Sequence, residues 1–83
     1  MYSVVVDDRV SKDMKHFPSD AKQIILRKID LLGSDPWPTQ SKKLKNRPGF
    51  RLRVGNYRVI YDVLTEDKQI VVYEVGHRKD IYR

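Results

Sequence analysis

The stretch "FRLRVGNYRVIY", residues 50–61, decides most of the fold. Apolar residues recur at every second position on both sides of Gly55-Asn56, a pair that favours a two-residue hairpin turn because both residues tolerate positive φ. The stretch therefore predicts antiparallel strands over residues 50–54 and 57–64. Their register would place Arg53 directly opposite Arg58, which destabilises the strand pair by roughly 0.2–1 kcal/mol. An anion held between the two guanidinium groups would offset that cost.

Alternation along the hairpin predicts one apolar and one basic face. The apolar face, expected to pack on helices, would carry Phe50, Leu52, Val54, Tyr57, Val59, Tyr61 and Val63. The opposite face would carry Arg51, Arg53, Arg58, Ile60 and Asp62. Arginine suits phosphate because its planar donors match phosphate oxygens. The alternative interpretation is that these arginines are simply solvated.

Charge along the chain points in the same direction. The protein has 83 residues, 17 Lys and Arg against 11 Asp and Glu, and a formal net charge of +6. No acidic residue occurs between Pro36 and Tyr61, a window that also holds Lys42, Lys43, Lys45 and Arg47. A basic block in a folded domain indicates a polyanion partner such as nucleic acid, or else a solvated basic surface.

The remaining sequence predicts an α+β domain. "YSVVVDD" reads as an opening strand, and apolar residues at helical spacing predict helices over about residues 8–16 and from an N-cap at Ser19 to Gly33 in a left-handed C′ position. Residues 34–49 read as a loop anchored by Trp37 and Leu44, and residues 69–76 as a last strand. The expected order is β-α-α-β-β-β, with the two N-terminal helices on one face of a small, twisted, mainly antiparallel four-stranded sheet.

The position of the last strand depends on the turn after Leu64. A turn with an odd number of residues would place Leu64 opposite Ile70 and Arg58 opposite Gly76, and would bring Arg78 onto the basic face. A four-residue turn would put Arg78 on the other face. In the first register Ile60, Ile70 and Val72 would form an exposed apolar surface suited to a protein partner.

Several classes of protein are not favoured. The chain has no cysteine, no spacing typical of metal ligands, no glycine-rich phosphate loop and no Ser/His/Asp arrangement, so no cofactor or metal is expected. No long apolar run or signal peptide is present, which favours a soluble cytoplasmic protein of one domain, residues 1–83. Glu74 is open to two interpretations, a partner of a site arginine or a salt bridge with no role in chemistry.

Two segments, "KKLKNRPGFRLRVGNYRVIYDV" (residues 42–63) and "VVYEVGHRKDIYR" (residues 71–83), resemble the RelE branch of the RelE/ParE superfamily, toxins of type II toxin–antitoxin systems. The resemblance implies ribosome-dependent cleavage of mRNA in the ribosomal A site without a metal. The RNA's own 2′-hydroxyl would attack the adjacent phosphate. It also implies an antitoxin partner that keeps the toxin silent.

The resemblance also implies roles for individual residues. Arg58 would stabilise the charged transition state, Arg78 would lie near the leaving 5′ oxygen, and Tyr82 would orient the RNA. Arg51 and Arg53 stand where familiar members have lysine. Because arginine stays protonated, these two residues stabilise charge and proton transfer falls to Tyr82, His77 or the ribosome. Lys42, Lys43, Lys45 and Arg47 would contact RNA or ribosome.

Two other functions remain open at the level of sequence. The ParE branch has the same fold and inhibits DNA gyrase without cleaving RNA. The arginines with a tail tyrosine favour RelE, whereas the departure from lysine and the short tail keep ParE open. A third possibility is an RNA-binding module or a degenerate toxin that has no activity.

Overall fold

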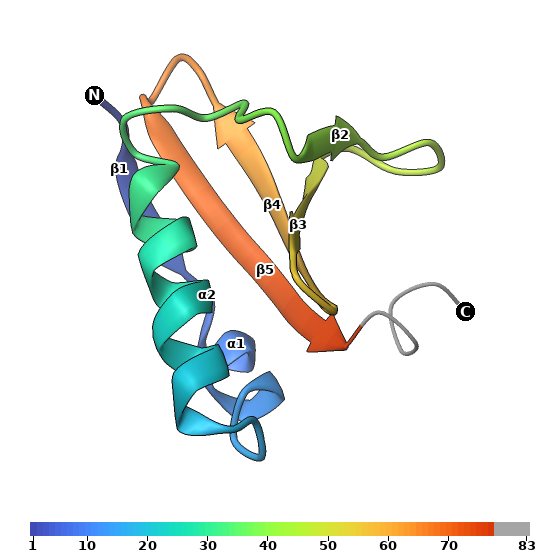
Figure 1. The fold of residues 1–83 in the computed structure, drawn as a ribbon. Coiled ribbons are helices and arrows are strands. Elements are labelled where there is room, and N and C mark those ends of the chain that lie inside the picture. Colours follow the sequence, from blue (N-terminus) through green and yellow to red (C-terminus); the bar gives the residue numbers. More distant parts are fainter. Residues whose placement is uncertain (78–83) are drawn as a thin grey trace.

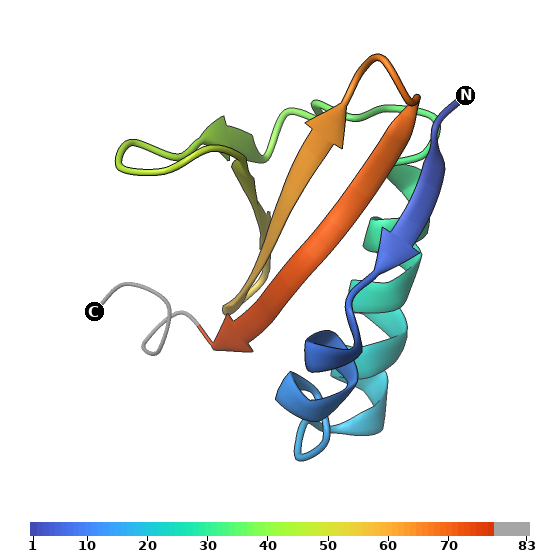
Figure 2. The same ribbon diagram turned by 180° about the vertical axis from the view of Figure 1, so that it is seen from behind.

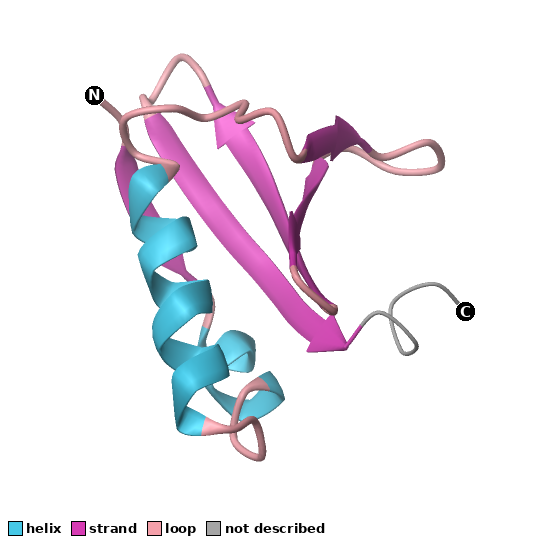
Figure 3. Ribbon diagram, viewed as in Figure 1, coloured by secondary structure: helices cyan, strands magenta, loops and turns pink. Residues whose placement is uncertain are grey.

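The structure is a computed structural model that describes residues 1–77. Within that range the chain forms two helices and one five-stranded sheet in the order β1-β5-β4-β3-β2 (Figure 1, Figure 3). β1 is parallel to β5 and the other neighbours are antiparallel. The elements are β1 (Ser3–Val6), α1 (Asp8–Asp13), α2 (Ser19–Leu31), β2 (Ser41–Lys43), β3 (Phe50–Val54), β4 (Tyr57–Leu64) and β5 (Gln69–His77).

The expected α+β architecture is confirmed. Both helices lie along the β1 side of the molecule and cover one face of the sheet, whereas β2 and β3 curl away at the other end (Figure 1, Figure 2). We call the covered side the helix face and the other side the open face. The apolar stripe predicted on α2 packs on the helix face, where Ile25, Ile29 and Leu32 are buried.

The hairpin residues form the other half of the core, as predicted. Leu52, Val54, Val59 and Tyr61 are at most 6% exposed and belong to the same buried cluster as the α2 stripe. The predicted register is also confirmed, with Arg53 opposite Arg58 and Val54 opposite Tyr57. Only Gly55 of the turn pair has positive φ, 58°, which is the pattern of a turn that needs glycine at its first central position.

The ends of the helices differ from the prediction. α1 stops at Asp13 and not near residue 16, because the amides of Lys15 and Phe17 already bond three residues back, at 3.3 and 3.1 Å, and tighten the chain. Ser19 is the first helical residue of α2 and not its cap. Pro18 takes the cap position, and its carbonyl accepts from the Lys22 amide at 3.0 Å.

Gly33 follows α2 without the left-handed conformation that was expected. Glycine is needed here because the backbone of Tyr2 comes very close: a Cβ at this position would lie 2.9 Å from the Tyr2 carbonyl oxygen. The Gly33 carbonyl accepts from the Tyr2 amide at 2.8 Å. Glycine at this position therefore lets the end of α2 meet the start of β1.

The segment expected to be a loop over residues 34–49 contains strand β2. Ser41, Lys42 and Lys43 pair antiparallel with Leu52, Arg51 and Phe50. Three residues are too few to show a periodic pattern, and the partner strand β3 determines that they extend. Trp37, expected to anchor this segment in the core, is 49% exposed but packs edge-on against the rings of Tyr2 and Phe50 at centroid distances of 6.5 and 6.4 Å.

The pairing of β4 with β5 also differs from the expected register. The turn over residues 65–68 places Leu64 opposite Gln69, not Ile70. A bulge then inserts Tyr73, because Tyr61 pairs with Val72 whereas Ile60 pairs with Glu74. Arg58 consequently lies opposite Gly76 as predicted, but the bulge and not an odd-length turn is responsible.

The apolar surface predicted on the open face is not present as expected. Ile70 and Val72 are fully buried in the core on the helix face, since the four-residue turn reverses the side to which they point. Ile60 does lie on the open face, opposite Arg51, yet it is only 3% exposed. The open face therefore offers no docking surface made of these three residues.

Candidate functional site

The arginines of the hairpin meet in a pocket on the open face. Cross-strand pairing aligns Lys42 with Arg51 and Arg53 with Arg58. The pocket has a volume of about 290 Å³ and, among the described residues, no carboxylate lines it. We call it the arginine pocket; it is lined by Thr39, Gln40, Lys42, Arg51, Arg53 and Arg58.

Arg58 is held firmly at the base of this pocket. It is 6% exposed although it points away from the helices. One terminal nitrogen, Nη1, donates to the carbonyl oxygens of Tyr57 and Gly55 at 2.9 and 3.2 Å. The interpretation that the hairpin arginines are simply solvated therefore does not describe Arg58. Its side chain curls back because the turn offers carbonyl acceptors within reach, and the guanidinium is preorganised.

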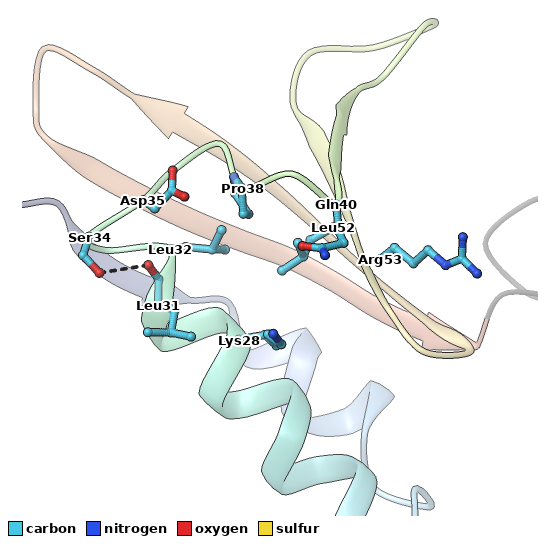
Figure 4. A pocket seen from close by; sticks show the side chains of 9 residues that line it. All are labelled: Lys28, Leu31, Leu32, Ser34, Asp35, Pro38, Gln40, Leu52 and Arg53. Carbon is cyan, nitrogen blue, oxygen red and sulfur yellow. Dashed lines mark hydrogen bonds between the residues drawn. The ribbon is translucent and has the colours of Figure 1, made fainter.

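Arg53 is the exposed member of the like-charged pair. Its side chain extends away from the labelled residues at the end of α2 and in the loop before β2 (Figure 4). Four cationic side chains in one small pocket raise the local positive potential, and such a pocket concentrates anions. The arrangement fits a phosphate group of a polyanion better than it fits a neutral ligand.

Only one of the four further basic residues named from sequence reaches the arginine pocket. That residue is Lys42. Lys43 pairs with Phe50, so it points to the other side of β2, and it lines a separate open hollow with Lys45 and Arg47. A nucleic acid would have to extend along the β2–β3 loop to touch both groups.

Glu74 pairs with arginines outside the arginine pocket. Its Oε1 lies 3.7 Å from Nη2 of Arg9 and 3.7 Å from Nη2 of Arg47. Both arginine side chains are more than half exposed, so each contact contributes little to stability. One of these partners, Arg47, is among the residues predicted to contact RNA or ribosome, so neither sequence interpretation of Glu74 is excluded.

His77 lies on the helix face. It is directly opposite Tyr57, and residues directly opposite in an antiparallel pair point to the same side. Its ring meets that of Tyr57 edge-on at 5.5 Å, and Tyr57 in turn packs on Phe17 at 4.7 Å. His77 therefore points away from the arginine pocket, and the pairing of Arg58 with Gly76 already requires this position. Arg78 and Tyr82 lie outside the described residues.

A second hollow, of about 220 Å³, lies on the helix side between the end of α2 and the loop before β2 (Figure 4). Leu31, Leu32, Pro38 and Leu52 supply its apolar wall. Ser34 Oγ donates to the Leu31 carbonyl at 3.2 Å and closes the helix end. The side chains around it suggest no acid–base or nucleophilic chemistry.

Tyr61 ties the loop before β2 to the sheet. Its buried hydroxyl donates to the Pro36 carbonyl at 2.6 Å. Burial raises the pKa of Tyr61 above its ordinary value, and this effect outweighs the lowering by Ser41. Thr39 and Gln40, which this loop carries into the arginine pocket, had no sequence signal because β2 alone positions them. Among residues 1–77 no group of His, Asp and Glu side chains is arranged to hold a metal ion.

The chain is similar to known proteins in both sequence and fold. A family model described as the ParE toxin of type II toxin–antitoxin systems, parDE, matches residues 4–82. The chain belongs to this toxin family. Within the wider RelE/ParE superfamily it is a RelE-type toxin, because its relatives include a putative RelE toxin and a chain of a RelE–RelB complex.

Three of these relatives cover nearly the whole toxin. The putative toxin RelE1 of Methanocaldococcus jannaschii is 29% identical over 99% of this chain and 96% of its own length. The archaeal RelE–RelB complex of Pyrococcus horikoshii OT3 contains a chain that is 30% identical, with a TM-score of 0.80 over 93% of this toxin and 94% of that chain. The toxin–antitoxin complex RelBE2 of Mycobacterium tuberculosis has a TM-score of 0.82 at 24% identity, over 93% and 98%, and shows likeness of fold.

No described helix of the toxin is long and apolar enough to span a lipid bilayer.

Proposed function

We propose that the toxin is a ribosome-dependent endoribonuclease that cleaves mRNA in the ribosomal A site and so inhibits translation. The observation that carries the proposal is the arginine pocket, where Lys42, Arg51, Arg53 and Arg58 converge without a lining carboxylate among the described residues. The RelE relatives and the matching fold support the same assignment.

The proposed reaction is an internal transfer at one RNA phosphate. The 2′ oxygen forms a bond to phosphorus, the bond from phosphorus to the 5′ oxygen breaks, and the products are a 2′,3′-cyclic phosphate and a 5′-hydroxyl. A proton leaves the 2′-hydroxyl and a proton reaches the leaving 5′ oxygen. Negative charge grows on the phosphate oxygens in the transition state, so fixed cations lower the barrier.

The pocket residues divide this task. Arg58 is preorganised by Gly55 and Tyr57 and would stabilise the charge that develops on the phosphate. Arg51 and Arg53 would hold the same phosphate or its neighbour from β3. With the charge neutralised by guanidinium groups, the reaction as proposed uses no metal ion.

Proton transfer must come from groups other than these arginines, since guanidinium stays protonated. His77 is disfavoured for this role by its contact with Tyr57 on the helix face. Tyr82 and groups of the ribosome are the remaining candidates, with Arg78 proposed near the leaving oxygen. We propose that a cognate antitoxin protein silences the toxin, because related toxins were solved as complexes with an antitoxin. The proposed substrate places the toxin in the cytoplasm.

Primer extension on a defined mRNA in a purified translation system tests the proposal. New breaks inside the A-site codon that require both ribosomes and toxin are expected. The same mRNA with toxin but without ribosomes is the control. Intact mRNA in the presence of folded, antitoxin-free toxin would refute the proposal.

A second candidate function is inhibition of DNA gyrase. The observation that favours it is that the matching family model is the ParE toxin. A supercoiling assay with purified gyrase separates the two functions, because a gyrase inhibitor would block supercoiling and leave ribosome-bound mRNA intact.

A further inference from the structure

The bulge in β5 decides which residue lies opposite Arg58, at the base of the arginine pocket. Tyr73 is the extra residue, and beyond it Val75 turns into the core while Gly76 lies opposite Arg58. A strand without the bulge would continue the earlier pairing. It would place Val75 opposite Arg58 and turn the Glu74 carboxylate toward the core. One inserted residue therefore keeps an apolar side chain from the position opposite Arg58 and keeps the Glu74 carboxylate out of the core.

The backbone hydrogen bonds along the edge of β5 that faces β1 show the same shift by one residue. The Lys68 carbonyl accepts from the Ser3 amide at 3.0 Å. The Val72 carbonyl accepts from the Asp7 amide at 2.9 Å. Because backbone groups alternate between the two edges of a strand, the amide of Glu74 would be the next group on this edge if no bulge were present.

Instead, the Val75 amide is on this edge, and Asp13 meets it. The Val75 nitrogen donates to Oδ2 of Asp13 at 3.1 Å, across 62 residues of sequence. β1 ends at Val6, so it offers no strand neighbour to this part of β5. α1 returns over the edge, with Val10 buried beneath it, and presents Asp13 at its last residue.

We propose that Asp13 is a positioning residue that holds β5 in the bulged register. It thereby keeps Gly76, and not Val75, opposite Arg58. The bond to Val75 forms only in that register, since an unbulged strand would direct the Val75 amide toward β4. The effect on cleavage rests on the proposed function, whereas the effect on strand register does not. A hydrogen bond to a charged acceptor is stronger than a neutral one, and a displacement of about 1 Å at a reacting centre can lower a rate by roughly 100-fold.

Hydrogen exchange at the Val75 amide measures how strongly its bond to Asp13 protects this part of β5. In Asp13→Ala the Val75 amide is expected to exchange at least about tenfold faster than in wild type, and the NOE between Arg58 and Gly76 to weaken. Asp13→Asn keeps an acceptor oxygen and should restore protection to within about threefold. Asp13→Ser, whose hydroxyl is too short to reach, must behave like the alanine variant, and Lys12→Ala on the same helix is the matched control. Unchanged Val75 protection in both the alanine and serine variants would overturn the proposal.

Cleavage on ribosomes measures the consequence. At saturating programmed ribosomes and a temperature at which every variant is folded, Asp13→Ala should cleave at least about tenfold more slowly, with Asp13→Asn and Lys12→Ala within about threefold of wild type. Gly76→Val places a side chain opposite Arg58 directly, and it should slow cleavage while Val75 stays protected. Wild-type cleavage by Asp13→Ala with an unprotected Val75 would overturn the positioning role. Absence of cleavage by the wild type would refute the proposed function instead, and exchange at Val75 would still decide whether Asp13 locks the register.

Discussion

Replacing Arg58 by alanine should damage both stability and activity, because the same guanidinium serves the turn and the pocket. The substitution removes two hydrogen bonds from a charged donor, to Tyr57 at 2.9 Å and to Gly55 at 3.2 Å. Bonds of this kind contribute about 1.5–3 kcal/mol each when buried, and less here because the pocket admits water. Relief of repulsion with Arg53 returns roughly 0.2–1 kcal/mol. We expect the free energy of unfolding to fall by about 1–3 kcal/mol.

Thermal and chemical unfolding of Arg58→Ala and Arg58→Lys measure this effect. For a domain of this size each kcal/mol shifts Tm by roughly 4–8 °C. Lysine keeps the charge, but one ammonium group cannot reproduce the planar guanidinium, so the lysine variant should lie between alanine and wild type. Primer extension below both Tm values should show cleavage reduced by roughly 100-fold or more in the alanine variant, in the range seen when a single charge-stabilising donor is removed.

Two results would contradict this reasoning. An alanine variant with unchanged Tm would show that the bonds to the turn contribute nothing. A destabilised but fully active variant would show that Arg58 is a structural residue and that the charge on the phosphate is stabilised elsewhere. Arg53→Ala, which removes an exposed pocket arginine without turn contacts, is the matched control and should leave Tm unchanged or slightly raised.

The remaining predictions concern the core. Leu52→Ala should lower the free energy of unfolding by about 2–5 kcal/mol, since Leu52 is 2% exposed and faces Val59; a thermally neutral variant would mean that the two faces of the hairpin are swapped. Burial raises the pKa of Tyr61 above its ordinary value of 10.0, so the stability it provides is complete below pH 10 and is lost as the pH rises through 10 toward the raised value. Urea unfolding of wild type and Tyr61→Phe from pH 8 to 11 should therefore show that the variant loses less free energy of unfolding as the pH rises. At pH 8 the variant should be less stable than wild type, because the Pro36 carbonyl loses its donor. Equal pH slopes would refute this account. Gly49→Ala should destabilise clearly, because φ is 111° and a Cβ would lie 2.8 Å from the Tyr61 carbonyl oxygen, and a Tm equal to that of wild type would contradict it.

Local patterns sufficed for the hairpin and for the apolar stripe of α2. Alternation about Gly55-Asn56 leads directly to the pairing of Arg53 with Arg58, because a two-residue turn leaves one register. Residues 50–61 carry both core contacts and the three arginines of the arginine pocket within one short stretch. For that reason Arg51, Arg53 and Arg58 were recognisable as one group before any tertiary contact was known.

Other features of the arginine pocket depend on contacts between distant segments. β2 extends only because β3 lies beside it, and with it come Thr39, Gln40 and Lys42. His77 moves to the helix face because Tyr73 is inserted into β5. Glu74 pairs with Arg9 and Arg47, neither of which is its neighbour in sequence.

The sequence by itself determined the class of fold, the basic face of the hairpin and the family of the toxin, since each of these depends on residue type at short spacing. The tertiary structure alone decided the burial of Arg58, the side on which His77 lies and the register of β5. The physical reason is that a bulge costs one residue of pairing, which periodicity cannot reveal. Whether it forms depends on the burial of Val75 and on the carboxylate of Asp13, which α1 brings from the other end of the chain.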